Sequence, residues 1–140
     1  MIEIEIERKI GDFGFEALDQ QGHKVLTDAS SDIGGQNTGA RPMQLMLMAL
    51  GTCSAIDVVN ILKKQRQTID SFKMKVSGER EQDVEPSLWK KAHINFELKG
   101  PIDQQKAERA CALSIEKYCS VAETMRRAGA EISWEVKVIS

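Results

Sequence analysis

One long apolar segment constrains the fold of this chain more than any other feature. Between Met43 and Ile56, only three polar side chains interrupt the apolar residues. Pro42 precedes the segment, and proline suits the first turn of a helix because its φ is already helical and its missing N–H would lack a partner there. The sequence therefore predicts a helix from Pro42 to about Lys64, buried on nearly all sides along its apolar half.

The length of this helix also predicts a partner subunit. A helix of about 20 residues spans ~30 Å, roughly the diameter of a small domain. One chain of 140 residues is not expected to cover it completely, so we expect a homodimer. A membrane span is disfavoured, because the apolar stretch is shorter than the ~20 residues required. Asp57 and Asn60 also follow on the same helix, and polar residues are costly in lipid.

The rest of the chain contains strand patterns and a second helix. Ile2, Ile4 and Ile6 alternate with glutamates, as in a strand with one buried face. Further strands are predicted at residues 13–18, 23–27, 72–76, 94–98 and 132–138. The turn-forming residues 28–41 predict a loop. Asp103 is expected to cap a second helix that runs to about Ala128.

This order of elements predicts the fold class. Three strands, a helix, two strands, a helix and a final strand favour an α+β fold with a largely antiparallel sheet. A chain of 140 residues is the size of one ordinary domain, so we expect a single domain over residues 1–140.

Composition excludes several classes of function. A formal net charge of −2 gives no field that would attract nucleic acid or an anionic membrane, so we expect neither partner. Structural zinc is disfavoured, because the chain has no Cys-x-x-Cys and His23 and His93 are isolated from the cysteines. The glycines of residues 34–39 do not match a phosphate-binding loop. We therefore expect no metal and no cofactor.

The cysteines and the N-terminal residues predict a cytoplasmic location. Three cysteines without closely spaced pairs do not form the disulfide framework of a small secreted domain. The first residues alternate apolar and acidic side chains, whereas a secretory signal has a basic start and a continuous apolar region.

Two of the cysteines, Cys53 and Cys119, lie in the predicted helices and are candidates for thiol chemistry. A nucleophilic thiolate needs a pKa lowered by a cation, a helix N-terminus or a base. A buried cysteine without such neighbours packs as a small hydrophobic residue. We expect that role for Cys111, which follows the apolar residues Ala107 and Ala110.

Read together, the two cysteine segments resemble the OsmC/Ohr family, the osmotically induced and organic-hydroperoxide-resistance proteins. The matching pieces are Arg41-Pro-Met-Gln-Leu-Met-Leu-Met-Ala-Leu-Gly-Thr-Cys53 and Glu116-Lys-Tyr-Cys119-Ser-Val. The resemblance extends over the whole chain and is closest to a subgroup with Tyr-Cys-Ser-Val at the second cysteine. It implies an intertwined homodimer whose sheet packs against two long central helices, with active sites at the subunit interface.

The resemblance also implies a thiol-dependent peroxidase. Cys53 would attack an organic hydroperoxide and become a sulfenic acid, and Cys119 would resolve it as a disulfide. An external dithiol would then reduce the disulfide. The candidate substrate-binding residues are Met43, Gln44, Met46, Leu47 and Leu50. Their helical spacing fits a core as well as a channel.

The chain departs from the better-known members at two positions. They have a glutamate directly after the helix-opening proline, where this chain has Met43, and an early arginine that is missing near residues 11–14. Arg8 and Arg41 are the candidate substitutes. Two alternatives to the peroxidase therefore remain: a module that binds a lipid-like or thiol-bearing small molecule in the interface pocket, and a structural dimer without a site.

Overall fold

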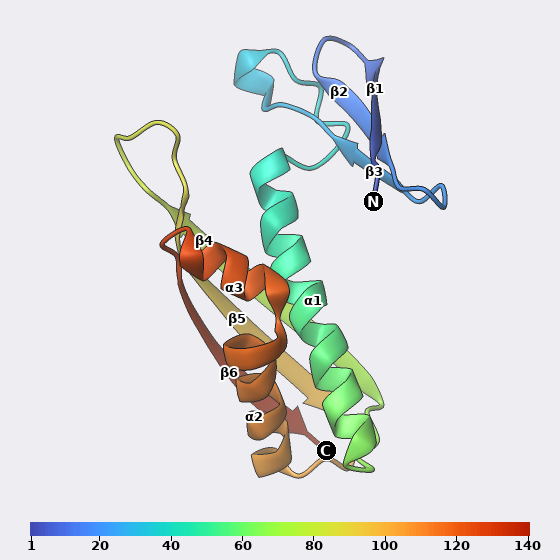
Figure 1. Ribbon diagram of the computed structural model, residues 1–140, viewed down its shortest axis with the longest axis vertical. Coiled ribbons are helices and arrows are strands. Elements are labelled where there is room, and N and C mark those ends of the chain that lie inside the picture. The colour runs from blue at the N-terminus through green and yellow to red at the C-terminus, as the bar shows by residue number, and fades with distance from the viewer. The chain divides into compact units, whose positions relative to one another are not determined.

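The computed structural model describes all residues from Met1 to Ser140. The chain forms two compact units, Met1–Met46 and Leu47–Ser140. The chain contains both strands and helices, which confirms the mixed α+β class that the sequence predicts (Figure 1). The single domain over residues 1–140 stays a prediction.

The first unit is built on a three-stranded antiparallel sheet. Strand β1 (Glu5–Ile10) pairs with β2 (Gly14–Leu18), which pairs with β3 (Lys24–Thr27). The predicted strands are thus confirmed, although the first lies several residues later than the alternation suggested. Ile6, Ala17 and Val25 lie opposite one another across the sheet. Ile6 is 65% exposed and Val25 44%, so this apolar row is uncovered in the single chain.

The predicted loop after β3 is organised by one buried carboxylate. Asp28 is only 2% exposed. It accepts hydrogen bonds from the backbone N–H groups of Ala29, Gln36 and Thr38 and, at 2.7 Å, from the Thr38 hydroxyl. These bonds, with the Thr38 side-chain bond as the largest cause, lower the pKa of Asp28 to about 2. The carboxylate therefore holds the loop as a charged acceptor.

Helix α1 (Pro42–Lys64) confirms the predicted long helix. At its start, the Gln44 side chain accepts a hydrogen bond of 3.0 Å from the Arg41 backbone N–H, which would otherwise lack a partner. The helix is long and apolar enough to cross a membrane by length and composition, but the core helix of a globular protein has the same property. Here one side of α1 packs on a sheet.

That sheet belongs to the second unit and has the order β4-β5-β6. Strand β4 (Ser71–Arg80) is antiparallel to β5 (Trp89–Lys99), and β5 is parallel to β6 (Glu131–Ile139). The fold is therefore largely antiparallel, with one parallel pair. Parallel neighbours need a crossover connection, which the helices after β5 supply.

Helices α1, α2 and α3 cover one face of this sheet (Figure 1). The core combines Ile94, Phe96 and Leu98 of β5 with Leu50 and Leu62 of α1, all buried. The approach of α1 is close, since a Cβ added at Gly51 would lie 3.0 Å from Cγ2 of Val76 on β4. Glycine at this position lets the helix lie directly on the sheet.

The second predicted helix is not continuous, and this part of the prediction is wrong. Helix α2 (Gln104–Leu113) passes into a π-helical turn, η2 (Ser114–Tyr118), and the chain becomes extended at Cys119 before α3 (Ser120–Arg127). Only α1 is long. The predicted ends hold, because Asp103 accepts from the backbone N–H of Lys106 at 3.0 Å and the helical segment closes before Gly129.

The side chain of Gln104, at the start of α2, covers part of the β6 edge. Its amide donates to the Val136 carbonyl at 3.1 Å, and its oxygen accepts from the Val138 N–H at 3.2 Å. Both backbone groups lie on the side of β6 that has no strand neighbour. A helix side chain therefore takes the place of a strand at this edge.

Burial of α1 is one-sided, which corrects the prediction of burial on nearly all sides. Leu50, Ser54 and Val58 are fully buried against the sheet side. Ile56 is 67% exposed and Val59 42%, on the opposite side of the helix. An apolar stripe of α1 is thus left without cover in the single chain.

The carboxylate of Asp28 generates a testable prediction. In Asp28→Asn, the amide nitrogen cannot accept the loop hydrogen bonds, so exchange of the Gln36 and Thr38 amides should accelerate about tenfold. In the unchanged protein the lowered pKa means that the carboxylate stabilises the loop fully above pH 4 and loses this effect as the pH falls through about 2. Hydrogen exchange followed by NMR measures both effects. Asp12→Asn, at an exposed position, is the control, and equal exchange in the two variants would contradict the role of Asp28.

Candidate functional site

The two predicted cysteines meet in the second unit. Cys53 lies on α1 and is partly buried, whereas Cys119 lies between η2 and α3 and is 2% exposed. Both are free thiols, and they lie close enough for Cys53 to raise the pKa of Cys119. Two thiols from different elements are therefore within reach of one another.

Cys119 is held as a neutral thiol. Burial is the largest cause that raises its pKa, to about 11, and the neighbouring Cys53 side chain acts in the same direction. Its Sγ also accepts a hydrogen bond of 3.4 Å from the Ala122 N–H at the start of α3, which opposes the rise without cancelling it. At neutral pH, Cys119 is a poor nucleophile in this state.

The π-helical turn η2 attaches Cys119 to α1. The Cys119 N–H donates to the Ser114 carbonyl at 2.7 Å. The Ser114 hydroxyl lies 3.0 Å from the Ser54 carbonyl oxygen and 3.1 Å from Oδ2 of Asp57, both on α1. One residue therefore contacts the helix that carries Cys53 and the backbone of Cys119.

Two arginines of α3 are engaged in ion pairs. Arg126 donates to the Ile115 carbonyl of η2 at 2.8 Å and to Glu123 at 3.0 Å. Arg127 donates to the other oxygen of Glu123 at 2.9 Å. Hydrogen bonds from Arg127 and then Arg126 lower the pKa of Glu123. Arg126 therefore links α3 to the turn before it.

Two hollows flank the cysteine segment. One, of about 340 Å³, is lined by residues that include Lys117, Tyr118, Cys119, Glu123 and Arg127. The other, of about 520 Å³, runs along α1 and is lined by residues that include Asp57, Asn60, Ile61 and Tyr118. Tyr118 contributes to both hollows and is 51% exposed. The smaller hollow is lined mainly by polar and charged side chains.

The predicted substrate-binding residues occupy different environments. Leu50 is fully buried in the core, and Leu47 packs against it. Met43, Gln44 and Met46 lie in the first turns of α1, within the first unit. Gln44 is bound to Arg41, as described above. The role of these five residues in binding a peroxide stays a prediction.

The structure places the candidate substitute Arg41 in the loop of the first unit. Its guanidinium donates to the Gly39 carbonyl at 3.0 Å and to Asn37 at 3.4 Å. Arg41 thus stabilises residues 37–39. Arg8 lies on β1, opposite Phe15.

Cys111 is a packing residue, as predicted. It is fully buried in the core on α2. Burial, with a smaller effect of the Glu108 charge, raises its pKa to about 12. A thiol in this state is inert at neutral pH.

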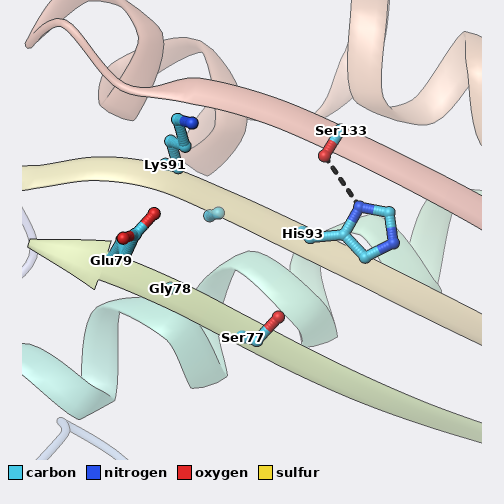
Figure 2. Close-up of a pocket in the computed structure, with 7 residues that line it drawn as sticks. Ser77, Gly78, Glu79, Lys91, His93 and Ser133 are labelled. Carbon is cyan, nitrogen blue, oxygen red and sulfur yellow. Dashed lines mark hydrogen bonds between the residues drawn. The ribbon is translucent and has the colours of Figure 1, made fainter.

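A polar cluster around His93 was missed by sequence analysis. Figure 2 shows His93 and Ser133 of this cluster on the face of the sheet away from the helices, where they line a hollow of about 310 Å³. Nδ1 of His93 lies 2.7 Å from the Ser133 hydroxyl, and Nε2 lies 3.2 Å from Glu135 and 3.3 Å from Asn95. Only the register of β5 and β6 brings His93 and Ser133 together, and sequence spacing gave no signal of that register.

The His93 cluster is typical of cross-strand pairing on an exposed sheet face. Strand β5 is central and pairs on both sides, so its backbone offers no row of free N–H groups to stabilise an oxyanion. No group of three or more His, Cys, Asp or Glu side chains is arranged to hold a metal ion. The cysteine pair is therefore the candidate site.

Known proteins resemble most of this chain in sequence. Residues 35–135 match the family model OsmC, described as OsmC-like protein. Protein YhfA of Escherichia coli K12 is 39% identical over 108 residues, which cover 76% of this chain and 77% of YhfA.

Solved structures share the fold. A hypothetical protein from Aquifex aeolicus VF5 is 30% identical, with a TM-score of 0.81 over 100% of this chain and 98% of its own. The organic hydroperoxide resistance protein OhrB of Bacillus subtilis, at 16% identity and a TM-score of 0.68 over 98% of each chain, shows the fold alone. The family match over residues 35–135 and the identity with YhfA show that the chain belongs to the OsmC-like protein family.

Proposed function

We propose that this protein is a thiol-dependent peroxidase that reduces organic hydroperoxides in the defence against oxidative stress. The observation that supports it best is the proximity of two free thiols from different elements, Cys53 on α1 and Cys119 before α3. Membership of the OsmC-like family, whose fold is shared with organic hydroperoxide resistance proteins, indicates a peroxide-related stress protein.

Cys53 is the proposed nucleophile, because it is the more accessible thiol of the pair. Its thiolate attacks the terminal oxygen of R–O–O–H, the O–O bond breaks, and the products are the Cys53 sulfenic acid and, after protonation, the alcohol R–OH. Cys119 is buried and its pKa is raised, so it is the less reactive thiol toward the peroxide and remains reduced until the sulfenic acid forms.

Cys119 is the proposed resolving residue. Its sulfur attacks the Cys53 sulfenic acid, a disulfide forms, and water leaves. An external dithiol then reduces the disulfide by exchange, becoming a disulfide itself, and both protein thiols are restored. The need for such a reductant fits the expected cytoplasmic location.

A homodimer is the proposed assembly. The exposed stripe of α1 with Ile56 and Val59, and the apolar row of the first unit with Ile6 and Val25, are the surfaces that favour it. Burial of large apolar side chains contributes roughly 1.5–3 kcal/mol each relative to exposure. Within that assembly, Met43, Gln44, Met46, Leu47 and Leu50 are the proposed contacts of the organic group of the peroxide.

A binding module for a lipid-like or thiol-bearing small molecule is the second candidate. The hollow of about 520 Å³ beside Tyr118 favours it, because its size suits a small molecule. Met43 at the position of the family's glutamate points the same way, since one group expected to activate the thiol is replaced. A hydrophobic ligand retained through mild purification, together with no peroxide consumption, would support this candidate.

The peroxidase proposal predicts a specific disulfide. One equivalent of cumene hydroperoxide should convert the reduced protein to a Cys53–Cys119 disulfide, which alkylation and mass spectrometry identify. Cys53→Ser should lose peroxide consumption by ~10³-fold or more, as expected for removal of a nucleophile. Cys111→Ser is the matched control and should keep it. If the peroxide persists while both thiols remain alkylatable, the enzyme assignment fails.

The two raised pKa values predict the order of alkylation. Thiols react as thiolates, so below pH 9 Cys119, with a pKa of about 11, and Cys111, with a pKa of about 12, should react slowly with iodoacetamide. Cys53 should be labelled first. The rate at Cys119 should rise about tenfold for each pH unit up to its pKa. Peptide mapping over pH 6–10 measures these rates, and faster labelling of Cys119 than of Cys53 would reverse their assigned roles.

The proposed dimer predicts a charge-sensitive interface. Ile56→Glu should place a charge in the apolar stripe of α1, and light scattering at micromolar concentration should show dissociation to monomers. Val84→Glu is the control, because Val84 is an exposed apolar residue, 49% accessible, in the connection between β4 and β5. A stable, well-folded monomer of the unchanged protein would contradict the dimer.

A further inference from the structure

We infer that Ser114 is a positioning residue that holds Cys119 in reach of Cys53 and so controls formation of the disulfide. The inference concerns the resolving step and rests on the proposed function for its biological meaning. Its structural basis is the placement of one fully buried hydroxyl between α1 and the turn η2.

The hydroxyl and the backbone carbonyl of Ser114 contact the two segments that carry the cysteines. Its hydroxyl has one proton and two acceptors on α1, the Ser54 carbonyl at 3.0 Å and the Asp57 carboxylate at 3.1 Å. Ser54 is the direct neighbour of Cys53 in the chain. The carbonyl of Ser114 accepts the Cys119 N–H at 2.7 Å. Ser114 therefore links the backbone next to one cysteine with the backbone of the other.

The π-helical geometry explains why this link is needed. The π-helix is rare and occurs mostly as single turns, frequently at functional sites. In a continuous α-helix, the Cys119 N–H would donate to Ile115; here it donates one residue further back, and the Arg126 guanidinium takes the Ile115 carbonyl at 2.8 Å. The contacts of Ser114 with α1 favour the turn that directs Cys119 to Cys53.

Because Ser114 is buried, the loss of its hydroxyl is not compensated by solvent. Ser114 is 0% exposed, so no solvent molecule replaces its contact with α1 when the hydroxyl is removed. A disulfide forms only over a narrow range of Cα and Cβ separations. A small displacement of η2 is therefore expected to lower the probability that the two sulfurs meet.

Ser54 provides a matched control. It is also 0% exposed and lies beside Cys53, but its hydroxyl bonds only within α1, to the Gly51 carbonyl at 2.9 Å. Ser54→Ala and Ser114→Ala thus remove the same chemical group from equally buried positions. Only Ser114→Ala removes a contact between α1 and η2.

The test measures the effective concentration of the two thiols in a glutathione redox buffer, without peroxide. The protein dithiol reacts with oxidised glutathione to give the Cys53–Cys119 disulfide and two molecules of reduced glutathione. Ser114→Ala should lower the effective concentration about tenfold, whereas Ser54→Ala should stay within about twofold of the unchanged protein. Alkylation and mass spectrometry quantify the disulfide.

A second measurement separates the two chemical steps. With cumene hydroperoxide and dimedone, the Cys53 sulfenic acid should form at the same rate in Ser114→Ala as in the unchanged protein and should be trapped more often, because its resolution is slower. Loss of stability alone would not produce this split. Equal disulfide formation in Ser114→Ala and Ser54→Ala, or no intramolecular disulfide in the unchanged protein, would overturn the inference.

Failure of the proposed function has a different signature. The glutathione measurement would give the predicted difference between the two variants while the peroxide is not consumed.

If Ser114→Ala does not fold, Asp57→Ala replaces it, because this change removes one of the two acceptors of the Ser114 hydroxyl. It should lower the effective concentration about threefold, and no decrease would contradict the inference.

Discussion

The close packing of α1 on the sheet β4-β5-β6 is the constraint on which the rest of the structure depends. Gly51 allows this approach, since a side chain there would meet Val76 at 3.0 Å. The helix then presents Ser54 to the second helical segment and brings Cys53 within reach of Cys119. The same packing covers only one side of α1. One helix thus serves as core element, carrier of the candidate nucleophile and uncovered apolar surface.

The electrostatics of the site depend on unequal burial of the two thiols. Cys119 lies deep enough for burial to outweigh the hydrogen bond from the Ala122 N–H, so its pKa rises to about 11. A helix N-terminus usually favours a thiolate, and here the loss of solvent is the larger effect. Cys53 is the more accessible of the two. The asymmetry gives each cysteine a different proposed step in one cycle.

Local signals explain which elements the sequence could predict. Alternation of apolar residues predicted the strands, Pro42 predicted the start of α1, and Asp103 and Gly129 predicted the ends of the second helical segment. The break at Cys119 was missed, although Ser120 and Glu123 are typical of a helix start in the middle of that segment. The contact that accompanies the break, from Ser114 to Ser54, joins residues 60 positions apart. Neither it nor the parallel pairing of β5 with β6 follows from local periodicity.

The side chain of Gln104 has a consequence for how the second sheet can be extended. By occupying backbone groups of Val136 and Val138, it acts as a short substitute strand along β6. Any strand added at that edge would first have to displace a side chain anchored on α2, whereas the opposite edge strand, β4, has no such cover in the sheet order. An exposed edge is a template for further pairing. The two edges of the sheet therefore differ. The edge strand β6 is bonded to a side chain of the crossover that carries Cys119, whereas β4 has no further strand beside it.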